Sequence, residues 1–257
     1  MQKRGMSVSI FILLGVIILI IAGFGLYMRS YARTLNVEQQ DLSIDTVDLE
    51  RGIEECLKHT LLVGMMTVGQ RGGYYPDMPD PFFLHPLGGL PYYAYDGVVT
   101  IPEKEVVEES IANYIEAELD TCTSPLFSSY PYLTIHNQPI TAQVAIGVED
   151  VRAEIEYNLI VKEGEKEKTL KRFDAVTSDI RLDTVLTALQ ESRDAYTATA
   201  VCTSCLRNIA EQHDLFFTLY QQDMNTFSVR ISDLNSEFPY GGYEYYYAVH
   251  VRGEANA

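Results

Sequence analysis

The chain has 257 residues, of which 47% are hydrophobic and 11% aromatic, and its formal net charge is −17. This charge argues against a nucleic-acid-binding protein, because the phosphates of the nucleic acid would be repelled. The hydrophobic content is sufficient for one sizeable core or two small ones, so a globular domain is not excluded.

Residues 8–27 read VSIFILLGVIILIIAGFGLY and carry no charged side chain. About 20 residues at the helical rise span about 30 Å, the thickness of the hydrocarbon core of a bilayer. The sequence therefore predicts a transmembrane helix within residues 1–34, and the lipid bilayer as a partner. A cleaved secretory signal is the alternative, but its apolar core is usually shorter, about 7 to 15 residues, and ends at a small-residue site.

The distribution of charge predicts the orientation of this helix. All 36 acidic residues lie after residue 34, whereas the N-terminal tail carries Lys3 and Arg4. A large acidic domain is translocated largely regardless of its charge, and a short basic tail stays inside. We expect a single-pass cell membrane protein with a cytoplasmic N-terminus and an extracytoplasmic C-terminal domain.

The N-terminal tail also carries a family resemblance. Lys3-Arg4-Gly5, then Met6, Ser7 and the apolar run, resembles the class III signal of archaeal type IV prepilins. In that family a prepilin peptidase cuts after the small residue on the cytoplasmic side. The resemblance implies processing between Gly5 and Met6, with the apolar segment kept as an anchor or as the helical spine of a filament. Pilins usually carry a Glu five residues after the cut, where this chain has Ile10.

After a stalk or linker at residues 35–47, we expect one α+β domain over residues 48–257. Apolar residues three and four positions apart predict a helix over residues 48–69. Residues 72–91 contain five Pro and four Gly, which predicts a loop. The Tyr-rich segment 91–95 is typical of a short strand.

The rest of the domain predicts a mostly antiparallel sheet packed with amphipathic helices. Pro102 in a first turn opens a second helix, which is expected to end near Cys122. Alternating residues predict strands between 132 and 180, with a charged hairpin turn at 162–168. The remaining expected elements are helices at 182–196 and 201–214 and strands at 215–220, 226–231 and 243–251.

A second resemblance extends over most of the chain. Its cues are Glu55-Cys56-Leu57, Gly72-Gly73-Tyr74, Leu90-Pro91-Tyr92-Tyr93, Ile101-Pro102, Cys122 at a helix end, Cys202-Thr203-Ser204-Cys205-Leu206, Ile231-Ser232-Asp233 and Tyr245-Tyr246-Tyr247-Ala248. Their order is similar to that of a family of uncharacterised archaeal surface proteins with prepilin-like N-termini, from small-genome lineages. The resemblance implies an archaeal envelope and supplies no activity.

The four cysteines are Cys56, Cys122, Cys202 and Cys205. Outside the cytoplasm an even number suggests disulfides, with three possible connectivities. We expect Cys56 to pair with Cys122, because they lie on two helices that can pack together, and Cys202 with Cys205 in a small, strained and more reducible ring. Zinc is an alternative, although an all-cysteine site normally uses two close pairs. A thioredoxin-like role for Cys202 and Cys205 would need a βαβ unit, which is not evident.

Other chemistry is not indicated. The five histidines show no ligand spacing, and no metalloprotease, nucleophile-elbow, P-loop or dinucleotide motif occurs. We therefore expect no catalytic site, no metal and no other cofactor. Acidic positions could bind a divalent cation, around Asp233, Asn235 and Glu237 or around Asp77 and Asp80, but such residues more often form a solvated surface.

The chain contains 18 Tyr and no Trp. We favour an interpretation in which Tyr243, Tyr245 and Tyr247 form one face of a strand. The alternative is an exposed aromatic surface that binds a protein or a glycan.

Together these features predict a non-enzymatic, membrane-anchored, prepilin-like surface protein with a structural, adhesive or assembly role. Its partners would be copies of itself or other surface proteins. The alternatives are an extracytoplasmic thiol–disulfide protein that uses Cys202 and Cys205, and an anchored ligand-binding module.

Overall fold

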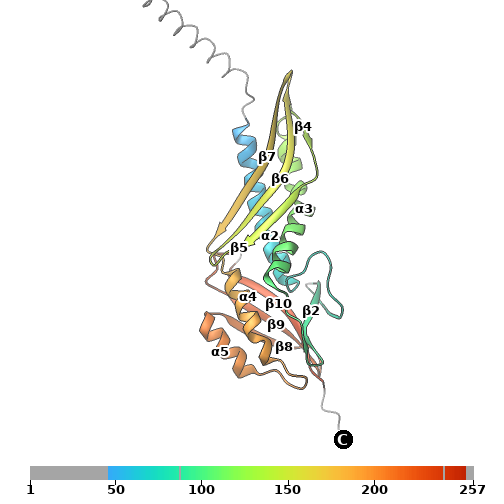
Figure 1. Ribbon diagram of the computed structural model, residues 1–257, viewed down its shortest axis with the longest axis vertical. Helices are drawn as coiled ribbons and strands as arrows, with labels where there is room; N and C mark the ends of the chain where they lie inside the picture. The colour runs from blue at the N-terminus through green and yellow to red at the C-terminus, as the bar shows by residue number, and fades with distance from the viewer. Residues whose placement is uncertain (1–45, 87, 240, 253–257) are drawn as a thin grey trace, which may run out of the picture. The chain divides into compact units, whose positions relative to one another are not determined.

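The computed structural model describes residues 46–86, 88–239 and 241–252, and Figure 1 shows the helices and strands. The predicted transmembrane segment, the processing site at Gly5 and Met6 and most of the stalk lie outside the described residues. No helix among those that are described is long and apolar enough to cross a bilayer. Most of the described residues belong to one compact unit, and the hairpin tip Lys162–Lys168 is assigned to another.

The fold is α+β, as predicted, and its described part contains four α-helices. The elements are α2 (Val47–Gln70), β1 (Phe82–His85), β2 (Gly88–Tyr95), β3 (Val98–Val99), α3 (Lys104–Ser128), β4 (Thr134–Asn137), β5 (Thr141–Ile146), β6 (Asp150–Glu163), β7 (Lys166–Ser178), α4 (Leu182–Glu191), the 3-10 helix η1 (Ser192–Ala195), α5 (Thr203–His213), β8 (Phe216–Gln221), β9 (Thr226–Asp233) and β10 (Tyr243–His250).

The first sheet has the strand order β1-β2-β10-β9-β8, and β3 pairs with β2. All of its pairs are antiparallel except β2 with β10, which run parallel, so the sheet is mixed but mostly antiparallel, as predicted. The parallel pair forms where the β9–β10 hairpin brings the last strand against β2 in the same direction. On β10, Tyr243, Tyr245 and Tyr247 are buried while Glu244 and Tyr246 are partly exposed, which confirms the favoured interpretation of the tyrosine run.

The second sheet has the order β4-β6-β5, with β7 also paired to β6. Every second residue of β6 from Val151 to Val161 is buried, which is the alternation expected of a strand with one face on a core. Helix α3 packs against β5, and two of its carboxylates bind the outer edge of that strand. Glu116 Oε1 accepts from the Ala142 amide and Glu108 Oε1 from the Ile146 amide, each at 2.8 Å. An open strand edge is therefore partly closed by a helix.

Helix α2 packs against both α3 and β10. Its buried stripe includes Leu49, Ile53, Cys56 and Leu57, as the periodicity predicted. Near its C-terminal end a Cβ on Gly69 would clash with the Tyr243 hydroxyl and would lie 2.9 Å from the Glu244 carbonyl oxygen. A glycine at this position therefore permits the close approach of α2 to the first sheet.

Several predicted boundaries are wrong. The stretch predicted as a loop contains β1 and the start of β2. Four of its five Pro residues lie before β1 or between the two strands, and Gly88, Gly89 and Pro91 of β2 pair with the edge strand β1. Helix α3 continues through Pro125 to Ser128 instead of ending near Cys122. The hairpin turn is shorter than predicted, since β6 ends at Glu163 and β7 begins at Lys166. The helix predicted at 182–196 divides into α4 and η1.

Candidate functional site

The structure joins the four cysteines in two disulfides, which are the pairs predicted from the sequence. Cys56 and Cys122 connect α2 with α3 across 66 residues, and Cys202 and Cys205 connect positions only three residues apart. Within the residues that the structure describes, no group of three or more His, Cys, Asp or Glu side chains is placed to hold a metal ion.

Asp233, one of the acidic residues considered as cation ligands, has other contacts. Asp233 is buried, its carboxylate accepts from the Asn235 amide at 3.1 Å and from Ser236 Oγ at 2.6 Å, and it pairs with Arg181 at 3.4 Å. These contacts give Asp233 a role in fixing the turn after β9.

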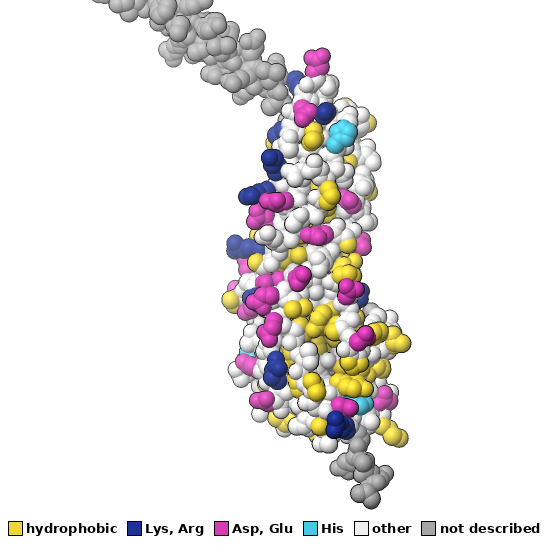
Figure 2. Space-filling view, turned by 45° about the vertical axis from the view of Figure 1, so that its right-hand side comes forward, with side chains coloured by type: hydrophobic (Ala, Val, Ile, Leu, Met, Phe, Trp, Pro, Cys, Tyr) yellow, Lys and Arg dark blue, Asp and Glu magenta, His cyan; other side chains and the backbone are white. Residues whose placement is uncertain are grey.

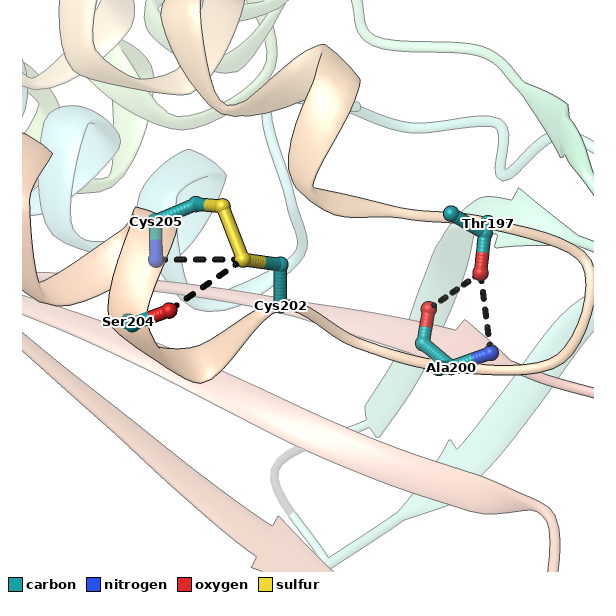
Figure 3. The surroundings of a disulfide bond; sticks show 5 residues. All are labelled: Thr197, Ala200, Cys202, Ser204 and Cys205. Carbon is teal, nitrogen blue, oxygen red and sulfur yellow. Dashed lines mark hydrogen bonds between the residues drawn. A yellow bond between two sulfur atoms is a disulfide. The ribbon is translucent and has the colours of Figure 1, made fainter.

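The second disulfide lies at the start of α5 (Figure 3). Cys202 is the N-cap residue, and its Sγ accepts the amide hydrogen of Cys205 at 3.2 Å. The Ser204 hydroxyl lies 3.5 Å from the same sulfur and must be the donor, because a disulfide sulfur carries no hydrogen. Both cysteines are partly exposed. The sequence placed the ring on the helix, whereas the structure places Cys202 just before it.

The backbone around Cys202 is held by bonds that do not involve the disulfide. Its amide donates to the Ala195 carbonyl at 2.8 Å, and its carbonyl accepts from the Leu206 amide at 3.1 Å. In the preceding turn the Thr197 hydroxyl donates to the Ala200 carbonyl at 2.9 Å and accepts from the Ala200 amide at 3.0 Å (Figure 3). The position of Cys202 is thus fixed from both sides along the chain.

Buried tyrosines form a hydrogen-bonded cluster beneath the first sheet. Tyr93 Oη donates to the Gly72 carbonyl at 2.8 Å and lies 2.7 Å from the Tyr245 hydroxyl, and its ring stacks on Tyr247 at 4.5 Å. The hydroxyls of Tyr196 and Tyr247 are also hydrogen-bonded. Burial raises the pKa of Tyr196 to about 12 and raises those of Tyr93 and Tyr247 well above the usual value. The cluster is neutral and closed, which fits a structural role.

The opposite face of the same sheet presents tyrosines to solvent. The register of β2 against β10 shifts between Ala248 and Val249, so that Tyr92 lies opposite Ala248 and Tyr95 opposite His250. Ala248 and His250 are two positions apart on β10 and therefore point to the same face of the sheet, and residues opposite one another share a face. The irregularity in the register thus brings Tyr92 and Tyr95 to the same side. The Tyr95 ring stacks on His250 at 4.8 Å and meets the Tyr92 ring at 5.1 Å.

Charged groups lie beside these rings. Asp96 Oδ1 is 3.1 Å from His250 Nδ1, and Asp96 Oδ2 is 3.7 Å from Arg252 Nε. A cleft of about 370 Å³ opens here, with Tyr74, Tyr92, Tyr95, Asp80, Asp96 and Arg252 in its wall. Figure 2 shows hydrophobic side chains gathered on this part of the molecule. Aromatic walls with a few polar groups are typical of ligand-binding clefts.

Sequence reasoning does not identify two charged residues of this cleft, Asp96 and Arg252, or the neighbouring His250 that stacks on Tyr95. The reason is that the parallel pairing of β2 with β10 brings together Asp96 and His250, which are 154 positions apart. Tyr92 and Tyr95 belong to the Tyr-rich segment at residues 91–95, but their common face depends on the irregular register of β2 against β10. Comparison of the chain with protein-family models, with curated proteins and with solved structures finds no match.

Proposed function

We propose that the chain is a membrane-anchored surface protein of prepilin-like type, whose α+β domain lies outside the cytoplasm in a structural, adhesive or assembly role. The observation that carries this proposal is the pairing of all four cysteines in disulfides. Disulfides persist in oxidising compartments and are rare in the cytosol. The uncharged run at residues 8–27 supplies the anchor that such a location needs.

An adhesive role is supported by the solvent-facing tyrosines of the first sheet. Tyr95 is 39% exposed and Tyr92 is partly exposed, and both line the cleft beside Asp96 and Arg252. Tyrosine combines a large rigid ring with a polar tip, so it contributes strongly to contacts between macromolecules. All 36 acidic residues of the chain lie after residue 34, and this excess of negative charge keeps the displayed domain soluble.

The location can be tested on intact cells that produce the full chain. Protease added from outside should degrade the domain without permeabilisation, and alkylation of the denatured but unreduced protein should leave all four cysteines unmodified. A domain that is digested only after permeabilisation, or that contains four free thiols in the cell, would contradict the proposal. A mature N-terminus at Met6, identified by peptide mass spectrometry, would establish prepilin-type processing, and filaments in negative stain would establish assembly.

A further inference from the structure

We propose that Cys202 and Cys205 form a thiol–disulfide exchange site that oxidises a pair of cysteines in a partner protein or peptide. The inference goes beyond the surface role and does not depend on it, because every group involved lies in η1, in α5 or in the segment between them. The pair is held as a partly exposed disulfide at the start of that helix (Figure 3).

The two sulfurs are not equivalent. The donors around the disulfide, the Cys205 amide and the Ser204 hydroxyl, are both directed at Cys202 Sγ. A sulfur at a helix N-terminus that accepts such bonds is stabilised as a thiolate. Cys202 is therefore the better leaving group, and Cys205 Sγ is the atom that an incoming thiolate attacks.

The charges of the helix start favour the same assignment. The first turns of α2, α3 and α4 each contain at least one acidic residue, among them Asp48, Glu105 and Asp183. The first turn of α5 contains none. The chain has 36 acidic residues. Among the α-helices that the structure describes, α5 is the one whose first turn contains no carboxylate that would repel a thiolate.

The exchange takes place in two displacement reactions. A partner thiolate attacks Cys205 Sγ, the Cys202–Cys205 bond breaks, and its electron pair goes to Cys202 Sγ, which leaves as a thiolate. The partner's second thiolate then attacks the partner's own sulfur in the mixed disulfide. The disulfide of the partner forms, and Cys205 Sγ leaves as a thiolate. Two electrons pass from the partner dithiol to the cysteine pair, which also takes up the two protons that the partner loses. A small disulfide such as oxidised glutathione returns the pair to its starting state.

The surrounding backbone allows this cycle without unfolding. The bonds of Cys202 to Ala195 and Leu206, and the turn closed by Thr197 and Ala200, remain when the disulfide opens. The amide that donates to Cys202 Sγ belongs to the backbone of residue 205 and is kept in any substitution of that side chain except proline.

The Cys56–Cys122 disulfide is an internal control in the same molecule. It joins the bodies of two packed helices, and Cys56 is only 7% exposed. In a titration of the full chain in detergent with reduced and oxidised glutathione, we expect Cys202–Cys205 to be reduced with an equilibrium constant about tenfold or more higher than that of Cys56–Cys122. Alkylation followed by peptide mass spectrometry measures both pairs at once.

Single variants test the assignment of the sulfurs. With a peptide disulfide as the probe at neutral pH, Cys205→Ser, which leaves the Cys202 thiol, should form a mixed disulfide about tenfold faster than Cys202→Ser. The unsubstituted chain should also oxidise one equivalent of a reduced two-cysteine peptide, while the variant Cys202→Ala/Cys205→Ala should not. Circular dichroism and an intact Cys56–Cys122 pair in each variant show that the domain is folded.

The proposal is overturned if the chain leaves the two-cysteine peptide reduced while its own Cys202–Cys205 disulfide stays intact. It is also overturned if both disulfides are reduced together in the glutathione titration. Equal rates for the two single variants would refute the role given to the Cys205 amide and the Ser204 hydroxyl.

Discussion

The two disulfides are expected to differ greatly in their contribution to stability. The paired replacement Cys56→Ala/Cys122→Ala, compared with Cys202→Ala/Cys205→Ala, measures this difference. A cross-link stabilises mainly by restricting the unfolded chain, and the effect grows with the logarithm of the loop that it closes. The loops differ in length by a large factor, because the paired cysteines are 66 and 3 residues apart.

The chain-entropy model converts these lengths into free energies of unfolding. At 25 °C it gives about 4.4 kcal/mol for the longer loop and about 1.6 kcal/mol for the shorter one. A domain of about 200 residues shifts its melting temperature by about 2 to 4 °C for each kcal/mol. We therefore expect losses of about 9 to 17 °C for the Cys56/Cys122 variant and about 3 to 6 °C for the Cys202/Cys205 variant.

Urea unfolding of the full chain in detergent, followed by circular dichroism, measures the difference. The Cys56/Cys122 variant should also unfold with a steeper dependence on urea, because its unfolded state exposes more surface without the cross-link. The Cys202/Cys205 variant should keep the slope of the unsubstituted protein. An equal or larger loss of stability in the Cys202/Cys205 variant would contradict the dependence on loop length and would give that pair a mainly structural role.

Three further predictions concern packing, a strand edge and pH. Gly69→Ala should destabilise the domain by about 1 to 3 kcal/mol in urea unfolding, because the new methyl group would clash with the hydroxyl of Tyr243. Glu116→Ala should cost about 1 to 3 kcal/mol and speed hydrogen exchange at Ala142, whose amide would lose its acceptor. Burial raises the pKa of Tyr196 from 10.0 to about 12, so stability should be intact below pH 10 and should fall as the pH rises through 12, measured by chemical unfolding at each pH.

Matched variants separate these effects from general damage. Gly52→Ala meets only the end of the Leu126 side chain, so it should be nearly neutral, and an equal loss there would contradict the Gly69 argument. Glu116→Gln keeps an acceptor oxygen and should retain slow exchange. Tyr196→Phe cannot ionise at this position, so its free energy of unfolding should depend less on pH between 10 and 12. If the pH dependence of the variant equals that of the unsubstituted protein, Tyr196 is not the cause of the loss of stability.

The spacing of apolar residues predicted those helices and strands in which buried residues recur at the period of a helix or of a strand. Helix α2 was expected at residues 48–69 and occupies Val47–Gln70, because its apolar stripe is continuous. Strand β6 alternates buried and exposed residues over most of its length. The pairing of Cys56 with Cys122 follows from the same helical periodicity, since two amphipathic helices that pack together bring cysteines on their facing sides close.

Pairing between distant segments could not be predicted in the same way. Strand β1 lies in a Gly- and Pro-rich stretch and is a strand only because β2 pairs with it. The parallel pairing of β2 with β10, and the irregular register that turns Tyr92 and Tyr95 to one face, depend on contacts across most of the domain. The cleft beside Asp96 therefore had no signal in the sequence except its tyrosines.

The buried tyrosines offer a physical reason why this distant pairing is specific. A core of hydrocarbon side chains would tolerate a shift of β2 along β10 more easily, because apolar contacts have no direction. The hydroxyl of Tyr93, in contrast, must meet both the Gly72 carbonyl and the Tyr245 hydroxyl, and a shifted strand would bury these groups without partners. An unpaired buried polar group costs about 1 to 3 kcal/mol. The tyrosines therefore penalise the wrong registers, which the hydrophobic pattern alone leaves open.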